Sequence, residues 1–245
     1  MTLRKAALGG IAVALIVAAC GGGDGDANER PALAVPDTID HEAAWTIPNE
    51  DVLRLLQRCP GPGPECVEGV MEDSGARPAA IDFFRQTQWF MLHHREMGTV
   101  DVASIFDPWR ANSNSDYALV NGSPAIIYAE DEGWNIAESL QDPEPTSLNN
   151  AYPDLNLWGG DNFFESVEES PQGGQAFIFQ YSLKDGCHAC ATGAFQRAAL
   201  DFEPDGTYVG PRLLDVCKSD FTNDTVSIVT SVADLDVCPI RIAGF

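Results

Sequence analysis

Two cysteines with a histidine between them form the part of the chain that is best suited to chemistry. The stretch KDGCHACA, residues 184–191, contains Cys187, His188 and Cys190. Two thiols at this spacing can act as a redox pair, half of a zinc site, a haem attachment or a structural disulfide. The choice depends on the element that carries the pair and on the compartment that the protein occupies.

A thiol–disulfide centre needs its first cysteine at the N-terminus of a helix, where backbone N–H groups and the helix dipole stabilise the thiolate. Here Gly186 precedes Cys187, Thr192-Gly193 follows Cys190, and the β-rich run DFEPDGTYVG comes soon after. Apolar residues within 195–202 also fit helical spacing, so a short helix stays open. If the protein is an enzyme, Cys187 and Cys190 are its candidate catalytic residues.

The haem and zinc interpretations fit the sequence less well than a disulfide does. Haem attachment needs a histidine directly after the second cysteine, and Ala191 stands there. Structural zinc needs four ligands, and the sequence has no second C-x-x-C to complete the set. We therefore predict a structural disulfide between Cys187 and Cys190, with no metal and no cofactor. A zinc site would have to take its fourth ligand from Cys217, Cys238, His93 or His94.

The N-terminus MTLRKAALGGIAVALIVAAC indicates export. It begins with Arg4 and Lys5, continues with an apolar run and ends at Cys20. The run has about 14 residues, too few for a bilayer core that requires roughly 20, so it is typical of a signal peptide. Val17-Ala18-Ala19-Cys20 resembles the lipobox of bacterial lipoprotein precursors. The resemblance implies cleavage after residue 19 and lipidation of Cys20, and Gly21 implies the outer membrane in a Gram-negative cell.

The rest of the chain divides into a tether and a folded part. Residues 20–44 start with the lipidated cysteine and continue in a Gly-, Asp-, Pro- and Ala-rich stretch without periodicity, which is typical of a disordered tether. Residues 45–245 contain no convincing linker, and we interpret 141–153 as a long surface loop. We expect one globular domain in the periplasm or at the cell surface, held to a membrane by its lipid.

The charge limits the partners. The chain has 37 acidic and 14 basic residues, a formal net charge of −23. Removal of residues 1–19 takes away two bases and no acids, which changes the net charge to −25. Such a field repels phosphate backbones, so we expect no nucleic-acid partner. A basic protein or another cationic envelope component is compatible with it.

The cysteine count supports export. Six cysteines remain after Cys20, and an even number in an oxidising compartment indicates disulfides. Partners that are close in sequence close the shortest loops. We therefore predict the pairs Cys59–Cys66, Cys217–Cys238 and Cys187–Cys190.

The expected elements are helices first and strands later. Asn49 can cap a short helix near 50–59, and a wide apolar stripe predicts a helix over 78–94. Near the end of that helix, His93 and His94 would point in different directions, one toward the core and one toward water. Strands are expected at 100–106, 117–128, 175–183, 198–214 and 225–232, with hairpin turns at Asn121-Gly122 and 204–206. This order predicts an α+β fold with a mainly antiparallel, disulfide-stapled sheet.

Two acidic stretches are interpreted as structural. Asp201, Glu203 and Asp205-Gly206 imitate the first half of an EF-hand loop, but Arg212 occupies the place of its bidentate glutamate, so we predict a β-turn. The run Glu130-Asp131-Glu132 is expected to be a solvated loop.

These observations favour a lipid-anchored envelope protein with a non-catalytic binding or structural role. The alternative is an envelope thiol–disulfide or metal-binding protein that uses Cys187 and Cys190. A third hypothesis follows from a resemblance to the Cys- and His-containing loop of periplasmic lysozyme inhibitors, which would present His188 to a basic target. The folded part also resembles uncharacterised exported bacterial proteins with a G-C-x-x-C turn.

Overall fold

A computed structural model describes residues 38–47, 52, 54, 57–59, 63–110, 115–140, 156–184 and 192–218, all within one compact unit. These residues form three α-helices and two four-stranded antiparallel sheets, which confirms the α+β prediction. Within them, no helix combines the length and the apolar character needed to cross a bilayer.

Three helical elements each begin at a proline or directly after an N-cap residue. The 3₁₀-helix η1 (His41–Ala43) is capped by the Asp40 side chain, and α2 (Pro64–Asp73) and α3 (Pro78–Thr87) each start with proline. Proline suits this position because its fixed φ matches the helix and its missing N–H would have no intrahelical acceptor. Val52 and Arg54 are also helical, in the region of the short helix that we expected.

The predicted helix over 78–94 is wrong in its second half. Gln88 adopts a left-handed conformation with φ 62°, which ends α3, and β1 (Phe90–Arg95) follows. Phe90 and Met91 are both buried. Two consecutive buried residues fit the apolar stripe of a helix and also a strand that is covered on both faces, so periodicity could not distinguish a helix from a strand here. Pairing with the next strand decides for the extended form.

The first sheet has the order β1-β2-β3-β4 and contains the strands expected at 100–106 and 117–128. They are β2 (Asp101–Phe106), β3 (Ser115–Val120) and β4 (Ile126–Tyr128). Asn121 opens the turn between β3 and β4 with φ 70°, a conformation that asparagine tolerates better than most residues. The predicted hairpin is therefore confirmed.

The second sheet is an antiparallel meander, β5-β6-β7-β8. Its strands are β5 (Asn156–Glu169), β6 (Gln175–Lys184), β7 (Thr192–Phe202) and β8 (Tyr208–Lys218). The strand expected at 175–183 and the hairpin that turns at 204–206 are confirmed. No sequence pattern predicted β5, α2 or the helix α4 (Ala129–Leu140) that precedes β5. The strand expected at 225–232 lies outside the described residues.

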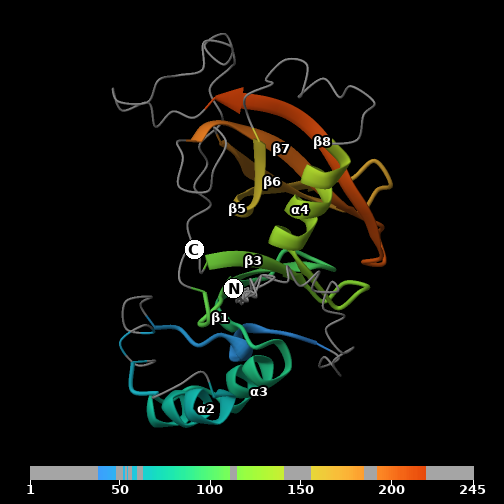
Figure 1. The fold of residues 1–245 in the computed structure, drawn as a ribbon. Helices are drawn as coiled ribbons and strands as arrows, with labels where there is room; N and C mark the ends of the chain where they lie inside the picture. The colour runs from blue at the N-terminus through green and yellow to red at the C-terminus, as the bar shows by residue number, and fades with distance from the viewer. Residues whose placement is uncertain are drawn as a thin grey trace, which may run out of the picture. The chain divides into compact units, whose positions relative to one another are not determined.

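Apolar clusters cover both faces of the first sheet. α2 and α3 pack with Phe90 and Phe106 in one cluster. α3 and η1 pack with Met91 and Ile105 in a second one. In a third one, residues of β2 and β3, including Val102 and Leu119, share a core with α4 and the second sheet. Figure 1 shows α2 and α3 side by side, and α4 between β3 and the second sheet.

Glycine allows α4 to approach β5 closely. A Cβ at Gly133 would lie 2.7 Å from the Cα of Gly159 and 2.5 Å from a ring carbon of Tyr181. Both distances are shorter than any real Cβ contact, so this crossing requires glycine at residue 133. The crossing fixes α4 and β5 together beside β3.

The N-terminal segment contributes to the fold before Trp45. Ile39 and Ala43, which the composition assigned to the tether, are buried at 2% and 5% exposure. The backbone N–H of Trp45 donates to the carbonyl of Met91 on β1 at 2.7 Å. The folded part therefore includes residues that precede the predicted boundary.

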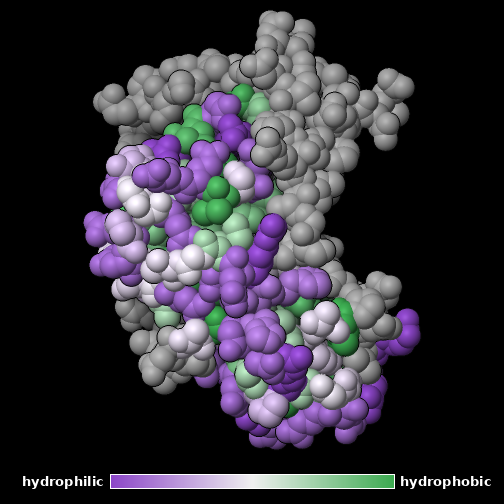
Figure 2. All heavy atoms as spheres, turned by 180° about the vertical axis from the view of Figure 1, so that it is seen from behind, coloured by the Kyte–Doolittle hydropathy of each residue, from purple (hydrophilic) through white to green (hydrophobic). Residues whose placement is uncertain are grey.

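The face of the molecule drawn in Figure 2 is mainly hydrophilic. On this face, apolar residues form small patches among polar ones. Large exposed apolar side chains in the described residues are Trp109, Phe163, Val209 and Leu213.

Candidate functional site

A cavity of about 280 Å³ lies where β2 and β3 meet β5. We call it the Asp116 cleft. Both sheets contribute to its wall, and polar and aromatic side chains converge there, as in most small-ligand sites. Its lining residues are Ser104, Ser115, Asp116, Tyr117, Gly160, Asp161, Asn162 and Phe163.

An irregularity in β5 brings the polar side chains to this place. The pairing of β5 with β6 shifts register between Trp158 and Asn162, so the segment between them bulges. A bulge of this kind redirects the side chains that follow it. Asn162 is consequently buried, and its Nδ2 donates to Oδ1 of Asp116 at 2.8 Å across the two sheets.

Asp116 is a buried carboxyl, only 4% exposed. Burial raises its pKa to about 7, the Asn162 hydrogen bond opposes that rise, and the nearby negative charge of Glu130 adds to it. The backbone N–H of Glu130 also donates to Oδ2 of Asp116 at 3.3 Å. At neutral pH this carboxyl is therefore close to half protonated.

The run Glu130-Asp131-Glu132 is the first turn of α4, so the predicted solvated loop is wrong for this segment. Acidic side chains suit a helix start because they face its positive end. Glu130 is buried and accepts hydrogen bonds from Arg110 and, at 3.2 Å, from the indole Nε1 of Trp134. Glu130 thus supports the wall behind Asp116.

Two buried polar atoms of the cleft residues have no hydrogen-bond partner within the described structure: Ser104 Oγ and Asn162 Oδ1. Leaving a buried donor or acceptor unpaired costs about 1–3 kcal/mol, so such atoms are rare outside functional sites. A ligand that donates hydrogen bonds would satisfy both atoms.

The charge of the cleft is negative and its walls are partly aromatic. Of its eight lining residues, the acidic ones are Asp116 and Asp161, and none is basic. Asp161 forms an ion pair with Lys184. Phe163 is 52% exposed and packs edge-on against Phe195 at 5.8 Å between ring centroids. Carboxyls beside aromatic rings favour a cation that carries an apolar stem.

The disulfide prediction has one complete confirmation. Cys59 and Cys66 are bonded, with a Cα–Cα distance of 5.8 Å and a sequence separation of 7. Cys217 is buried on β8 and disulfide-bonded. Cys20, Cys187, His188, Cys190 and Cys238 lie outside the described residues, so their pairings and roles stay predictions.

The strands that flank the C-x-x-C segment are described. Lys184 at the end of β6 pairs with Thr192 at the start of β7, so the segment connects two neighbouring antiparallel strands. Residues 185–191 lie outside the described residues, and both the disulfide and the redox interpretation stay predictions.

The alternative zinc ligands that the structure describes lie on two different sheets. His93 and His94 lie on β1 in the first sheet, and Cys217 lies on β8 in the second, where its disulfide occupies the sulfur. His93 is exposed and the His94 side chain is buried, so one faces water and one faces the core, as we expected. They point in different directions because side chains alternate along a strand, not because of helical spacing. The described residues contain no group of three potential metal ligands.

The EF-hand-like stretch is the predicted turn. Residues 204–206 turn between β7 and β8, and Gly206 has φ 84°. Both carboxylate oxygens of Asp201 accept hydrogen bonds from Arg212, at 2.7 and 2.9 Å. Asp201 is therefore committed to an ion pair.

Three residues of the cleft were not predicted from the sequence as site residues: Ser104, Asp116 and Asn162. A signal existed for Asp116, since an acid inside the strand run SDYALV calls for a buried partner. No local signal pointed to Asn162, because β5 was not predicted.

Comparison with known proteins yields no relative. No family model matches the chain, and neither a curated protein nor a solved structure matches it significantly.

Proposed function

We propose that this is a lipid-anchored envelope protein that binds a basic partner without catalysis, and that the Asp116 cleft receives a lysine or arginine side chain of that partner. The observation that carries the proposal is the wall of the cleft. It combines two buried atoms without partners, Ser104 Oγ and Asn162 Oδ1, with the carboxyl of Asp116. An ammonium or guanidinium group supplies the hydrogen-bond donors that the two unpartnered atoms lack and the positive charge that suits the carboxylate.

The aromatic walls support the same ligand. Tyr117 and Phe163 line the cleft, and the alkyl stem of a basic side chain packs well against such rings. The acidic surface supports it at longer range. A net charge of −23 draws a basic protein toward the surface and raises its association rate at low salt.

Binding fits the contacts better than catalysis. A serine nucleophile needs a base within hydrogen-bond reach. Ser104 Oγ makes no hydrogen bond to any of the described residues. Asp116 instead accepts from Asn162 and from the Glu130 backbone, which holds the carboxyl in the wall.

The anchor is part of the proposal. Cys20 follows a charged start, an apolar run and two small residues, which supports lipidation at that sulfur. Mass spectrometry of the mature N-terminus should find a diacylglyceryl cysteine, and Cys20→Ser should move the protein from the membrane to the soluble fraction. A mature chain that begins elsewhere would contradict the proposed lipid anchor, but it would not affect the proposal that the Asp116 cleft binds a basic side chain.

Calorimetric titration with two small ligands tests the cleft. Nα-acetyl-lysine methylamide carries the ammonium, and the norleucine analogue has a similar stem without it. We expect binding of the first, no binding of the second, and weaker binding at high salt. Equal binding of both ligands would refute the proposal.

Variants locate the binding. Ser104→Ala removes one acceptor and should weaken the lysine derivative about two- to tenfold, the range expected for one hydrogen bond. Asp116→Asn removes the charge and should weaken it more. The matched control is Asp73→Asn, because Asp73 is an exposed carboxylate on α2. If all three variants bound like the wild type, the ligand would not occupy this cleft.

A further inference from the structure

A second cavity, of about 390 Å³, lies beside the N-terminal segment. We call it the Trp45 pocket. Three stretches form its wall: the segment 41–47, the turn 74–77 after α2, and the end of β1. Its lining residues are His41, Ala44, Trp45, Thr46, Ile47, Ser74, Gly75, Ala76, Arg77, His93 and His94.

The composition of this pocket is unusual for so acidic a chain. The protein has 37 acidic residues, yet none of the eleven lining residues is Asp or Glu. The lining includes Arg77 and three of the four histidines in the sequence. The pocket is thus rich in hydrogen-bond donors, which is the opposite of the Asp116 cleft.

Trp45 contributes a buried donor without an acceptor. The residue is 3% exposed, and its ring packs edge-on against Phe90 at 5.1 Å between centroids. Its Nε1 is buried and has no hydrogen-bond partner among the described residues. An indole N–H can only donate, so an acceptor atom of a ligand would compensate it.

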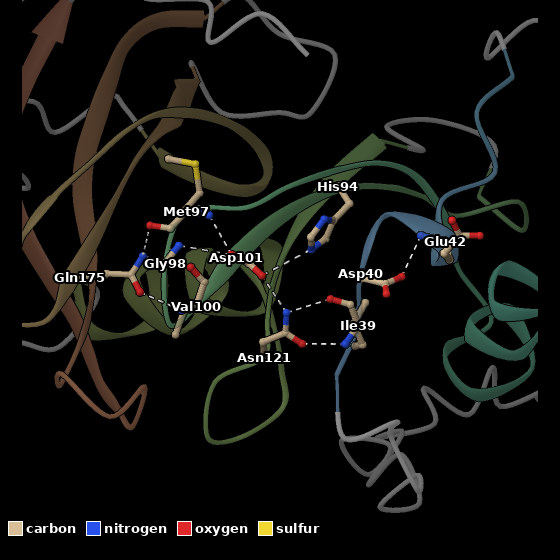
Figure 3. Close-up of polar contacts among 10 residues, drawn as sticks. All are labelled: Ile39, Asp40, Glu42, His94, Met97, Gly98, Val100, Asp101, Asn121 and Gln175. Carbon is tan, nitrogen blue, oxygen red and sulfur yellow. Dashed lines mark hydrogen bonds and ion pairs between the residues drawn. The ribbon is translucent and has the colours of Figure 1, made fainter.

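His94 lies beside a carboxylate, as Figure 3 shows. Its side chain is 2% exposed, and Nε2 lies 3.5 Å from Oδ2 of Asp101. Asp101 is itself fixed, because it accepts from the backbone N–H of Met97 at 2.7 Å and from Asn121 Nδ2 at 2.8 Å. His94 Nε2 is a further buried nitrogen of the pocket without a hydrogen-bond partner among the described residues.

The same network holds the segment that carries Trp45. The amide of Asn121 accepts from the N–H of Ile39 at 2.7 Å and donates to its carbonyl at 2.8 Å. Figure 3 shows Asn121 between Ile39 and Asp101. Because one asparagine joins both walls, the pocket is preorganised, and little entropy is lost when a ligand enters.

Arg77 provides the positive charge at the rim. It is about half exposed and pairs with Glu42 Oε1 at 2.7 Å. The same Glu42 oxygen lies 3.1 Å from Nε2 of His41. A guanidinium has five N–H donors, so Arg77 can bind a ligand carboxylate and keep this partner.

The geometry points to the Trp45 pocket as a binding site for a small organic carboxylate. The carboxylate accepts hydrogen bonds from the Trp45 indole and from Arg77, and the apolar part of the ligand packs against Ala76 and Ile47. This site is separate from the Asp116 cleft in its residues and in the charge that it selects.

Benzoate is the probe, and benzamide is its neutral counterpart of the same shape. In ¹H–¹⁵N correlation spectra of the full mature chain at pH 7, the Trp45 indole resonance, assigned with Trp45→Phe, should shift saturably with benzoate. Benzamide should bind at least tenfold more weakly, a difference of about 1.4 kcal/mol. Equal shifts with both compounds, or an indole resonance that does not move, would overturn the proposal.

A matched pair of arginine variants tests the contact. Arg77→Gln should raise the benzoate dissociation constant about tenfold. Arg58→Gln should leave it unchanged, because Arg58 forms an exposed ion pair with Asp73 and does not line the pocket. Equal losses in both variants would show that benzoate responds only to net charge and would refute the site.

Discussion

Asp116 should make the protein less stable as the pH rises. Its pKa in the folded state is about 7, mainly because burial disfavours the charged form. An unfolded aspartate has a pKa of about 3.9. The folded state therefore binds the proton more tightly, and the stabilisation that this provides is full below about pH 4 and is lost as the pH rises toward 7.

The size of the effect follows from the two pKa values. Each unit of difference corresponds to 1.36 kcal/mol, so about three units give about 4 kcal/mol in total. Between pH 5 and pH 8, about two of these units are titrated, which gives about 3 kcal/mol. The side chain is 4% exposed, so solvent screens little of this difference.

Urea unfolding of the wild type and of Asp116→Asn at both pH values measures it. Other carboxyls affect both proteins alike, so the difference between their unfolding free energies isolates Asp116. This difference should change by about 3 kcal/mol in favour of the variant when the pH rises from 5 to 8. Asp73→Asn is the control, since an exposed carboxylate keeps its hydration in the fold. A change below about 0.5 kcal/mol for Asp116→Asn would refute the argument that burial dominates this site.

Three further predictions concern packing and the cysteines. Gly133→Ala should lower the free energy of unfolding by about 1–3 kcal/mol in denaturant unfolding, because the added methyl group would overlap β5. Gly69→Ala in α2 is the control: its methyl group would meet no atom within 4 Å, so this variant should be more stable than the wild type by about 0.5–1 kcal/mol. Replacing both cysteines of Cys59–Cys66 by serine should cost about 2–3 kcal/mol on the chain-entropy model, and peptide mapping should find no free thiol at either position in the native protein. Cys187 and Cys190 should resist alkylation at mild reductant potentials; a midpoint above about −230 mV with one thiol reactive at pH 6 would instead indicate a redox centre.

Local signals predicted the elements that depend on neighbouring residues. The hairpin at Asn121 and the disulfide Cys59–Cys66 were readable because the interacting groups are close in sequence. The strands β2, β3, β6, β7 and β8 were readable because their apolar runs are bounded by turn residues.

The errors occurred where long-range contacts override local pattern. The apolar stripe of the expected helix over 78–94 continues through Phe90, yet pairing with β2 makes the second half a strand. The acids at Glu130 looked solvated, yet Arg110, twenty residues earlier, provides a buried partner. The irregular strand β5 follows neither a clean helical nor a clean strand period, so it was not predicted.

By itself, the sequence determined the net charge, the α+β fold class and the pairing of Cys59 with Cys66. The predicted anchor at Cys20 also depends on contiguous residues alone. Only the tertiary structure decided the two candidate binding sites. Asp116 and Asn162 are 46 positions apart, and Trp45 and His94 come from different elements, so no local pattern joins them. Their functional character depends on burial and on which polar atoms find no partner, and both are properties of the packed chain.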